Sequence, residues 1–381
     1  MPPAPDILSR SETIATHFPA LKDQWKNPED ILSILMIIGG DIVQSALSQL
    51  ISSHPRPFTP VAFSFGWVAY SFSAILSAVG SRQLVPEPDC RCILIEASSG
   101  YSRDVNSWVL SRLVRDYKRR HNQRTGLEIT FFDTVPDKQT GVPDRDWVYY
   151  QGVLVILLQI AIAAIPGAID GNWLVMIVTC SGNLLAQIQA ALPQWRQELW
   201  GARQIKPRKQ EVICLTKGNG SPYVMVIRSS QDQLRLADLA SGTEAAKGSR
   251  LTVFATLALT VLWFVLLLTM QGVEDGHWYM LVIGAVGMLQ NVIAAGARRE
   301  PAALGFHLKQ RVTFHCKKVF ETLTEAEKVE RNVGLDLLDV FFPAGLREHE
   351  EKWRQEMKDK YRQEKESLKE ISYENVATEK Q

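Results

Sequence analysis

Hydrophobic residues in this chain are gathered into long runs, with polar and charged residues concentrated between them. Two runs, residues 153–169 and 174–192, are separated only by Asp170-Gly171-Asn172-Trp173. Each run has about the length that crosses a bilayer core of roughly 30 Å. The short separation leaves room only for a tight turn, so the pattern predicts a transmembrane helical hairpin with an acidic tip.

The same unit recurs about a hundred residues later. Asp275-Gly276-His277-Trp278 separates the apolar runs 251–271 and 279–297. The two units align without gaps and share residues at equivalent positions, among them Trp173 with Trp278 and Gly182 with Gly287. Tryptophan is enriched at membrane interfaces, and glycine lets helices approach each other closely. The repeat therefore predicts two parallel copies of one hairpin.

A further pair of apolar runs, 31–51 and 58–80, is joined by a Pro-containing turn and completes six predicted spans. Nearly all basic residues lie in segments 81–147 and 194–250 or follow Arg298, whereas the short turns on the other side hold only Arg56. Lys and Arg near span ends are retained in the cytosol. The predicted fold is mainly α: a six-span transmembrane helical bundle of three hairpins, with both termini cytosolic.

This topology divides the chain into seven segments. They are a cytosolic N-terminal segment (1–30), a first transmembrane hairpin (31–80), a cytosolic α/β loop (81–147), a second hairpin (148–193), a cytosolic β-hairpin loop (194–250), a third hairpin (251–297) and a cytosolic C-terminal helical tail (298–381). Without a cleavable signal peptide or a visible sorting signal, a multi-pass protein of the endoplasmic reticulum is the default expectation.

The two long loops carry patterns of folded structure. Residues 92–96, 127–132, 211–216 and 223–228 are predicted strands, and the last two flank a Gly-rich hairpin turn. Segments 105–120 and 234–239 are predicted helices. One small mixed sheet built from both loops is expected, because an isolated hairpin is marginal in water. Farther on, the amphipathic stretch 335–342 could lie on the membrane surface, and the charged segment 344–370 is predicted to be a solvated helix.

Asp41 is the sharpest candidate for chemistry. A carboxylate at mid-membrane costs at least about 2.5–3.5 kcal/mol and requires a partner or a water-filled cavity. Ser45 and Ser48 share its helix face. This arrangement favours a proton or cation site, or an acid–base group for a lipophilic substrate. The alternative is a buried aspartate that stabilises helix packing through hydrogen bonds.

Amide side chains within the spans form a second candidate binding cluster. Asn183 and Gln187 lie one turn apart in the fourth span, and Gln290 and Asn291 lie in the equivalent part of the sixth. Hydrogen bonds between helices are the simpler interpretation. The loop 98–103 follows a strand and precedes a helix, so it could hold an anion at the helix N-terminus, or it is a plain loop capped by Asn106 or Ser107.

Composition excludes several other functions. The net charge of +1 gives no basis for nucleic-acid binding. The five cysteines are odd in number and are expected to be free thiols. Cys90-Arg91-Cys92 has no second Cys pair or histidine at ligand spacing, so neither a metal site nor a cofactor is expected.

Several blocks of the sequence resemble a large family of uncharacterised fungal multi-pass integral membrane proteins. They are GGDIVQSALSQL, FTPVAFSFGWVAYSFSAILSAVG, SSGYSRDVNSW, LTKGNGSPYVMVI and GHWYMLVIGAVGMLQNV, and the resemblance extends over about residues 31–342. Some family members are encoded in secondary-metabolite gene clusters. The family provides no catalytic residues to transfer.

The resemblance implies a membrane component of fungal secondary-metabolite biosynthesis. Such a protein would bind a lipophilic intermediate among the spans, alongside other pathway enzymes, and assist its cyclisation or modification with Asp41 as the polar group. Two alternatives stay open: a non-enzymatic membrane scaffold or receptor-like protein that docks cytosolic partners, and a transporter. Whether the chain is an enzyme is not decided by its sequence.

Overall fold

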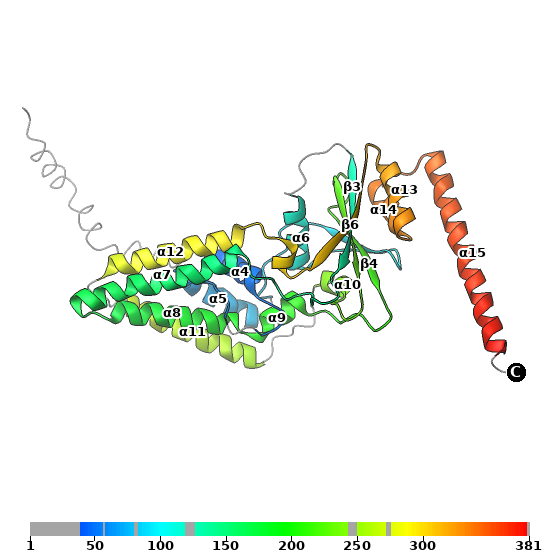
Figure 1. The fold of residues 1–381 in the computed structure, drawn as a ribbon. Coiled ribbons are helices and arrows are strands. Elements are labelled where there is room, and N and C mark those ends of the chain that lie inside the picture. Colours follow the sequence, from blue (N-terminus) through cyan, green and yellow to red (C-terminus); the bar gives the residue numbers. More distant parts are fainter. Residues whose placement is uncertain are drawn as a thin grey trace, which may run out of the picture.

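The computed structural model describes residues 39–55, 58–79, 83–118, 126–242, 250–271 and 276–378. Within these residues the molecule is mainly α and has two parts (Figure 1). A helical bundle forms one end, and a mixed β-sheet with helices on its faces forms the other. The part of the predicted first span before residue 39 and the N-terminal segment 1–30 lie outside the described residues.

Four long helices and two short ones build the bundle. They are α7 (Trp147–Asp170), α8 (Leu174–Ala190), α11 (Arg250–Gln271), α12 (His277–Gly296), and the shorter α4 (Gly40–Leu50) and α5 (Gly66–Val79). In the described residues, three helices are long and apolar enough to cross a membrane: Trp147–Asp170, Thr252–Met270 and His277–Gly296. A fourth span results if α8 is taken together with α9 (Pro193–Trp200), which is bent from it by 46°.

The six-span topology stays a prediction, because the first hairpin differs from the expected pair of helices. The described helix α4 has 11 residues and α5 has 14, or about 16 and 21 Å at 1.5 Å per residue. The predicted second span begins at residue 58, but residues 58–64 are not helical and α5 begins only at Gly66.

The outer surface of the bundle is the surface that lipid would contact. Large apolar side chains are exposed along α7, α8, α11 and α12, for example Leu154, Leu184, Phe254 and Leu289. Exposed aromatic residues mark both ends: Trp147 and Tyr150 at the start of α7, and Trp173 and Trp278 at the opposite turns. The 24 residues of α7 span about 36 Å, so these two aromatic levels are separated by roughly the thickness of a bilayer.

The second part of the molecule is a six-stranded sheet with strand order β2-β1-β4-β5-β3-β6. The strands are β1 (Ile93–Glu96), β2 (Tyr101–Asp104), β3 (Leu127–Thr134), β4 (Glu211–Thr216), β5 (Tyr223–Ser229) and β6 (Leu308–Cys316). Strands β3 and β5 are parallel, and the other neighbours are antiparallel. The predicted mixed sheet and its four predicted strands are confirmed, whereas β2 and β6 are additions. Strand β6 comes from the segment that was expected to be only a helical tail.

Helices cover both faces of this sheet. On the face toward the bundle, α6 (Trp108–Lys118) and α10 (Leu236–Ala240) share one apolar core with Ile213, Leu215 and residues of the bundle itself. On the other face, α13 (Val319–Val329) and α14 (Val333–Phe341) pack over Cys214 and Val226. Alternate residues of the central strands therefore enter opposite cores.

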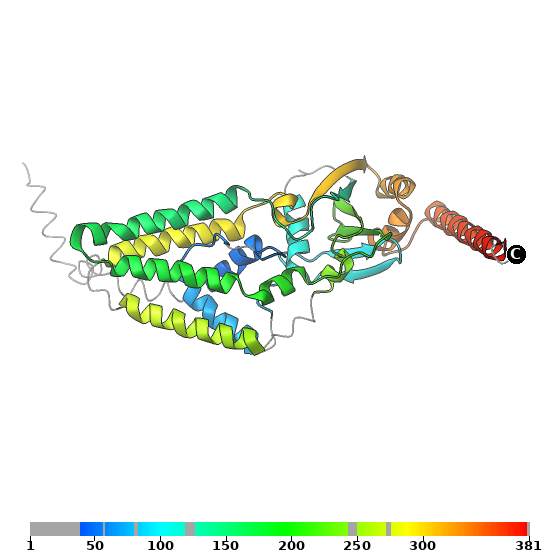
Figure 2. The ribbon, with the colours of Figure 1, turned by 60° about the horizontal axis from the view of Figure 1, so that its bottom comes forward.

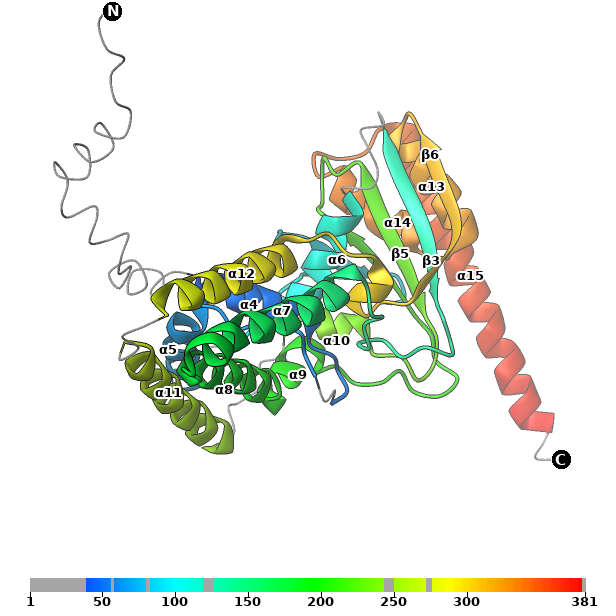
Figure 3. The ribbon, with the colours of Figure 1, turned by 60° about the vertical axis from the view of Figure 1, so that its left-hand side comes forward.

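Two C-terminal elements complete the fold. Helix α14 contains most of the stretch that could have lain on the membrane surface, but that expectation is wrong because Leu337 and Leu338 are buried against the sheet. Helix α15 (Glu348–Thr378) is the expected charged helix. Its first turns pack through Trp353 and Met357, and its remainder projects beyond the sheet (Figures 2 and 3).

Candidate functional site

A non-helical stretch of chain passes through the centre of the bundle. This core segment, residues 58–65, connects the turn after α4 to α5. Residues 60–65 are buried, and Phe63 stacks on Trp263 of α11 at 6.1 Å between ring centroids. Non-helical backbone at membrane depth is stable only if other groups satisfy its N–H and C=O groups, since each unsatisfied group costs several kcal/mol.

Amide side chains from three helices provide these partners. Gln187 of α8 accepts a hydrogen bond from the Thr59 N–H at 2.9 Å and donates to the Thr59 carbonyl at 2.8 Å. Gln290 of α12 accepts from the Ala62 N–H at 3.0 Å and donates to the Pro60 carbonyl at 3.2 Å. Each of these side chains therefore binds the core segment as a neighbouring strand would.

Three more amides continue the pattern around Phe63. Asn183 accepts from the Phe63 N–H at 3.1 Å, and Gln159 of α7 donates to the Phe63 carbonyl at 2.7 Å. Asn291 donates to the Ala62 carbonyl at 3.3 Å and to the Ser64 hydroxyl at 2.8 Å. The structure thus brings together all four amides singled out in the sequence. They bind the protein's own backbone. Gln159 also joins helices directly, because it accepts from Asn183 of α8 at 3.3 Å and donates to the Ile283 carbonyl of α12 at 2.9 Å.

Glycines make room for the core segment. A Cβ on Gly287 would lie 1.8 Å from the Phe63 carbonyl oxygen, and one on Gly182 would lie 2.5 Å from the Phe63 ring. A Cβ on Gly152 would lie 2.2 Å from the Pro60 carbonyl oxygen. The repeat-related Gly182 and Gly287 therefore admit Phe63 between two helices. Sequence reasoning expected these glycines to permit contact between helices.

Asp41 lies apart from this amide cluster. It is exposed in the first turn of α4, where a carboxylate is favoured by the helix dipole, and the neighbouring Gly39 packs on Met288 about halfway along α12. Ser45 is half-buried, and the buried Ser48 hydroxyl donates to the Gln44 carbonyl at 2.9 Å. Within the described part of the chain, Asp41 makes no hydrogen bond or ion pair. The geometry does not join Asp41, Ser45 and Ser48 into one polar site.

Two buried arginines connect the bundle to the sheet domain. Arg112 of α6 donates to the carbonyls of Ala295 and Ala297 at the C-terminal end of α12, at 2.6 and 3.0 Å, and to Asp89 at 2.6 Å. Its side chain is only 2% exposed. The last carbonyls of a helix have no partner within the helix and carry negative partial charge, so a cation satisfies them well.

Arg299 forms the other half of this junction. Its guanidinium binds Asp146, the N-cap residue of α7, at 2.8 and 2.9 Å, and donates to the Gln49 carbonyl at the end of α4. Its backbone N–H donates to Asp116 of α6 at 3.1 Å. The ends of α4, α7 and α12 are therefore fixed to α6 and through it to the sheet. In the sequence, Arg299 was only one of the charges that set orientation.

A cavity of about 360 Å³ lies in the sheet domain among charged residues at the ends of β1 and β4. Arg235 binds Glu96 at 2.9 Å and Glu211 at 3.2 Å. Burial acts to raise the pKa of Glu96, but hydrogen bonds from Arg235 and Ser99 outweigh it and leave that pKa lowered. Lys206 and Lys209 also line the cavity and are exposed. The cavity thus presents uncommitted positive charge on one side.

The loop that could have held an anion has a different structure. Residues Tyr101–Asp104 form β2, a hairpin partner of β1, and the N–H groups of Ser99 and Gly100 both donate to the Glu96 carbonyl within the turn. Helix α6 begins only at Trp108. The predicted helix N-terminus is therefore absent at this loop, because seven residues, 101–107, separate the turn from α6.

No cluster of three or more metal-ligating side chains occurs in the residues that the structure describes, and all five cysteines are free thiols. Comparison with protein-family models, curated proteins and solved structures finds no match to this chain. The structure itself defines the class: a helical bundle with helices long and apolar enough to cross a membrane, joined by buried arginine hydrogen bonds to a six-stranded mixed sheet.

Proposed function

We propose that this chain is a non-enzymatic membrane scaffold whose sheet domain binds cytosolic partners. One observation carries the proposal: the amide side chains that surround the core segment are engaged by the protein's own backbone. Gln187, Gln290 and Asn183 each accept a hydrogen bond from the core segment. A bundle used in this way supports a membrane anchor better than it supports a site for a lipophilic substrate or a transport path.

The junction supports the same function. Arg112 and Arg299 hold the sheet domain against the ends of three bundle helices, so the domain keeps a fixed orientation relative to the membrane. A rigid connection of this kind suits a protein that presents one surface to its partners. By the positive-inside rule, that surface faces the cytosol.

Lys206 and Lys209 mark the surface where a partner would dock. They lie on the loop between α9 and β4, close to Arg203, and line the 360 Å³ cavity. Arg203 and Arg235 bind carboxylates of this chain, whereas the two lysines make no ion pair within the described residues. An acidic segment of a partner protein is the chemistry that this cavity would recognise.

Charge reversal tests the proposal. Full-length protein with Lys206→Glu and Lys209→Glu, carrying a proximity-labelling enzyme at its C-terminus, should label a set of cytosolic proteins at least tenfold less than wild type. Lys317→Glu with Lys318→Glu makes the same charge change after β6 and should leave labelling unchanged. Equal labelling by all three proteins would contradict a partner site at this cavity.

A role in a secondary-metabolite pathway stays a prediction from the resemblance, and location in the endoplasmic reticulum stays the default expectation. The pathway role is tested by Asp41→Asn in the producing organism. A scaffold keeps forming product when Asp41 is changed and loses product when residues 81–147 are removed. Product lost in Asp41→Asn, at a normal protein level, would favour an enzyme or a transporter instead.

A further inference from the structure

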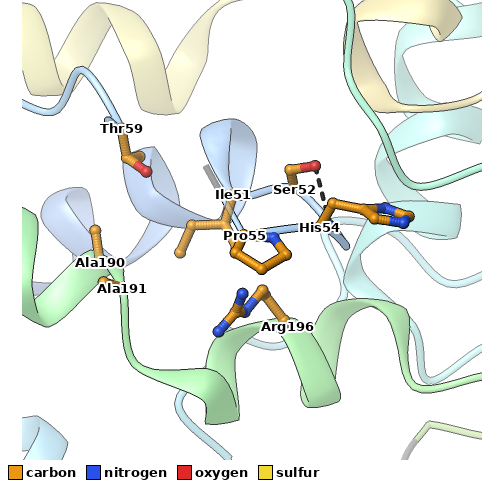
Figure 4. Close-up of a pocket in the computed structure, with 8 residues that line it drawn as sticks. All are labelled: Ile51, Ser52, His54, Pro55, Thr59, Ala190, Ala191 and Arg196. Atoms are coloured by element: carbon orange, nitrogen blue, oxygen red, sulfur yellow. Dashed lines mark hydrogen bonds between the residues drawn. The ribbon is translucent and has the colours of Figure 1, made fainter. Parts of the chain in front are cut away.

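A small cavity lies at the end of the bundle nearest the sheet domain (Figure 4). Its volume is about 80 Å³, where a single water needs about 10–15 Å³. It therefore has room for a group of a few heavy atoms. It is bounded by the ends of α4 and α8, by α9, and by the chain that leads into the core segment, with Ile51, Pro55, Ala190 and Ala191 among its apolar lining.

The depth of this cavity can be fixed from its neighbours. Ser53, beside the cavity, donates its N–H to the Gly141 carbonyl at 2.7 Å, and Pro60, next to Thr59 in the cavity wall, packs on Gly152 of α7. Along the chain, the exposed Trp147 at the start of α7 lies between Gly141 and Gly152, and an exposed tryptophan at a helix end marks the membrane interface. The cavity is thus at the depth of the lipid headgroups.

Four polar residues line the cavity. Ser52 accepts from the His54 N–H within the turn after α4, and Arg196 and Thr59 face the cavity from opposite sides. Figure 4 shows the Arg196 side chain entering from α9 and the Thr59 hydroxyl entering from the core segment. Arg196 is half-buried and makes no ion pair within the described ranges. Gln187 binds both the N–H and the carbonyl of Thr59, and the Thr59 hydroxyl makes no hydrogen bond to any described residue.

The carboxylate of Glu198, two residues farther along α9, makes no ion pair with Arg196. Glu198, on the same helix, accepts hydrogen bonds from the Val85 N–H at 2.9 Å and from Gln194 at 2.6 Å. Arg196 therefore keeps a positive charge available at the membrane interface. A guanidinium binds phosphate oxygens through charge-assisted hydrogen bonds, which are stronger than bonds between neutral groups.

An apolar stripe begins beside the cavity and runs deeper into the bilayer. Leu184, Ile188 and Ala191 lie on one face of α8 and its end, spaced by four and three residues. Leu184 is 60% exposed and Ile188 is 45% exposed. A lipid whose phosphate entered the cavity could lay an acyl chain along these side chains, whereas a free phosphate ion would not use them.

We propose that this cavity binds the phosphate of an anionic lipid in the leaflet nearest the sheet domain. Arg196 pairs with the phosphate, the Thr59 hydroxyl donates to it, and the acyl chain covers Leu184 and Ile188. The bound lipid would connect α9, α8 and the chain entering the core segment. This site is separate from the proposed partner surface on the sheet domain and does not depend on it.

Native mass spectrometry of the full chain in detergent, titrated with phosphatidylglycerol, tests this site. Wild-type protein should bind one phosphatidylglycerol, and Arg196→Ala should bind it about tenfold more weakly, because it loses a charge-assisted bond. Arg196→Lys should retain part of the affinity. Lys206→Ala removes an exposed, unpaired cation outside the cavity and should bind like wild type.

Two further titrations identify the source of the phosphate. Phosphatidylcholine should bind more weakly than phosphatidylglycerol, and inorganic phosphate at equal concentration should not compete with the lipid. Inorganic phosphate that displaces the lipid completely would overturn the lipid assignment in favour of a free anion. Equal lipid binding by wild type, Arg196→Ala and Lys206→Ala would overturn the site itself. If Arg196→Ala is not recovered folded, Arg196→Gln takes its place under the same criteria.

Discussion

The bundle and the sheet domain satisfy the hydrogen-bonding groups of buried backbone in different ways. Both contain buried non-helical backbone whose N–H and C=O groups need partners. In the sheet, neighbouring strands provide these partners, as β4 and β5 do from Glu211 opposite Ser229 onward. In the bundle, five side-chain amides provide them for the core segment.

As a result, side chains have different structural roles in the two regions. In a strand, backbone pairs with backbone, so side chains mainly have to fill space and can be exchanged for others of similar size. Around the core segment, the side chain itself is the hydrogen-bonding partner. Replacing Gln187 leaves both an N–H and a C=O of Thr59 without their amide. The bundle should therefore be much less tolerant of substitution at its polar positions than the sheet is at its apolar ones.

The largest effect is expected at the junction between the two regions. Arg299→Met would leave the Asp146 carboxylate and the Gln49 carbonyl without their guanidinium partner, and breaking a buried ion pair costs about 3–5 kcal/mol. Arg145→Met removes an exposed arginine that stacks on Tyr149 and makes no ion pair with a described residue, so it serves as the control. Thermal unfolding of the detergent-solubilised chain measures both. Equal melting temperatures would show that Arg299 does not hold the two regions together.

A smaller effect tests the core segment directly. Gln187→Leu should lower the free energy of unfolding by about 2 kcal/mol, since two backbone groups of Thr59 lose their amide partner. Met225→Leu, in β5 of the sheet, keeps the backbone ladder and should cost less than about 1.5 kcal/mol. Chemical denaturation of both variants gives the comparison. If Met225→Leu lowered the free energy of unfolding more than Gln187→Leu, the bundle would not be the region less tolerant of substitution.

The smallest effect concerns an unsatisfied group in the outer layer of the sheet domain. Burial, together with the charges of Glu327 and Asp339, raises the pKa of Asp336 to about 7, and its Oδ2 is buried without a hydrogen-bond partner among the described residues. Because the pKa is higher in the folded state than in the unfolded state, the fold favours the protonated acid. Stability should therefore rise as pH falls from 8 through 7 toward 5.

Asp336→Asn should remove this dependence. Because Asp336 is partly exposed, the free energy of unfolding of the variant should exceed that of wild type by only about 1 kcal/mol at pH 8, and by little at pH 5. Asp359→Asn, an exposed position on α15, should follow the wild-type pH dependence. Melting temperatures at the two pH values measure the effect. Parallel pH profiles for wild type and Asp336→Asn would show that Asp336 is not the titrating group.

The two regions also differ in how much of them the sequence predicted. Central strands such as β4 and β5 are buried on both faces, and their apolar, β-branched runs identify them. The edge strand β2 has the sequence YSRD and is largely exposed, so it lacks the alternation that would predict it. Strand β6 is also an edge strand. It depends on hydrogen bonds from β3, a neighbour distant in sequence, whereas β2 depends on its hairpin partner β1.

In the bundle, the amides were recognised as polar groups among apolar helices, but their partner was not. The core segment is as apolar as a span and was predicted to be helical from residue 58. Only Pro60, which lacks an N–H, signals that this backbone is not an ordinary helix. Helix α14 shows the same limit, because its amphipathic pattern fits a membrane surface and a sheet face equally well.

The sequence by itself determined the apolar helices, the central strands and the residue types available for hydrogen bonding, because these depend on periodicities of a few residues. The tertiary structure decided which polar groups meet. Gln187 and Thr59 are 128 residues apart, and Arg299 and Gln49 are 250 apart. No local pattern encodes such pairs, since they form only when the helices and the sheet domain have packed together.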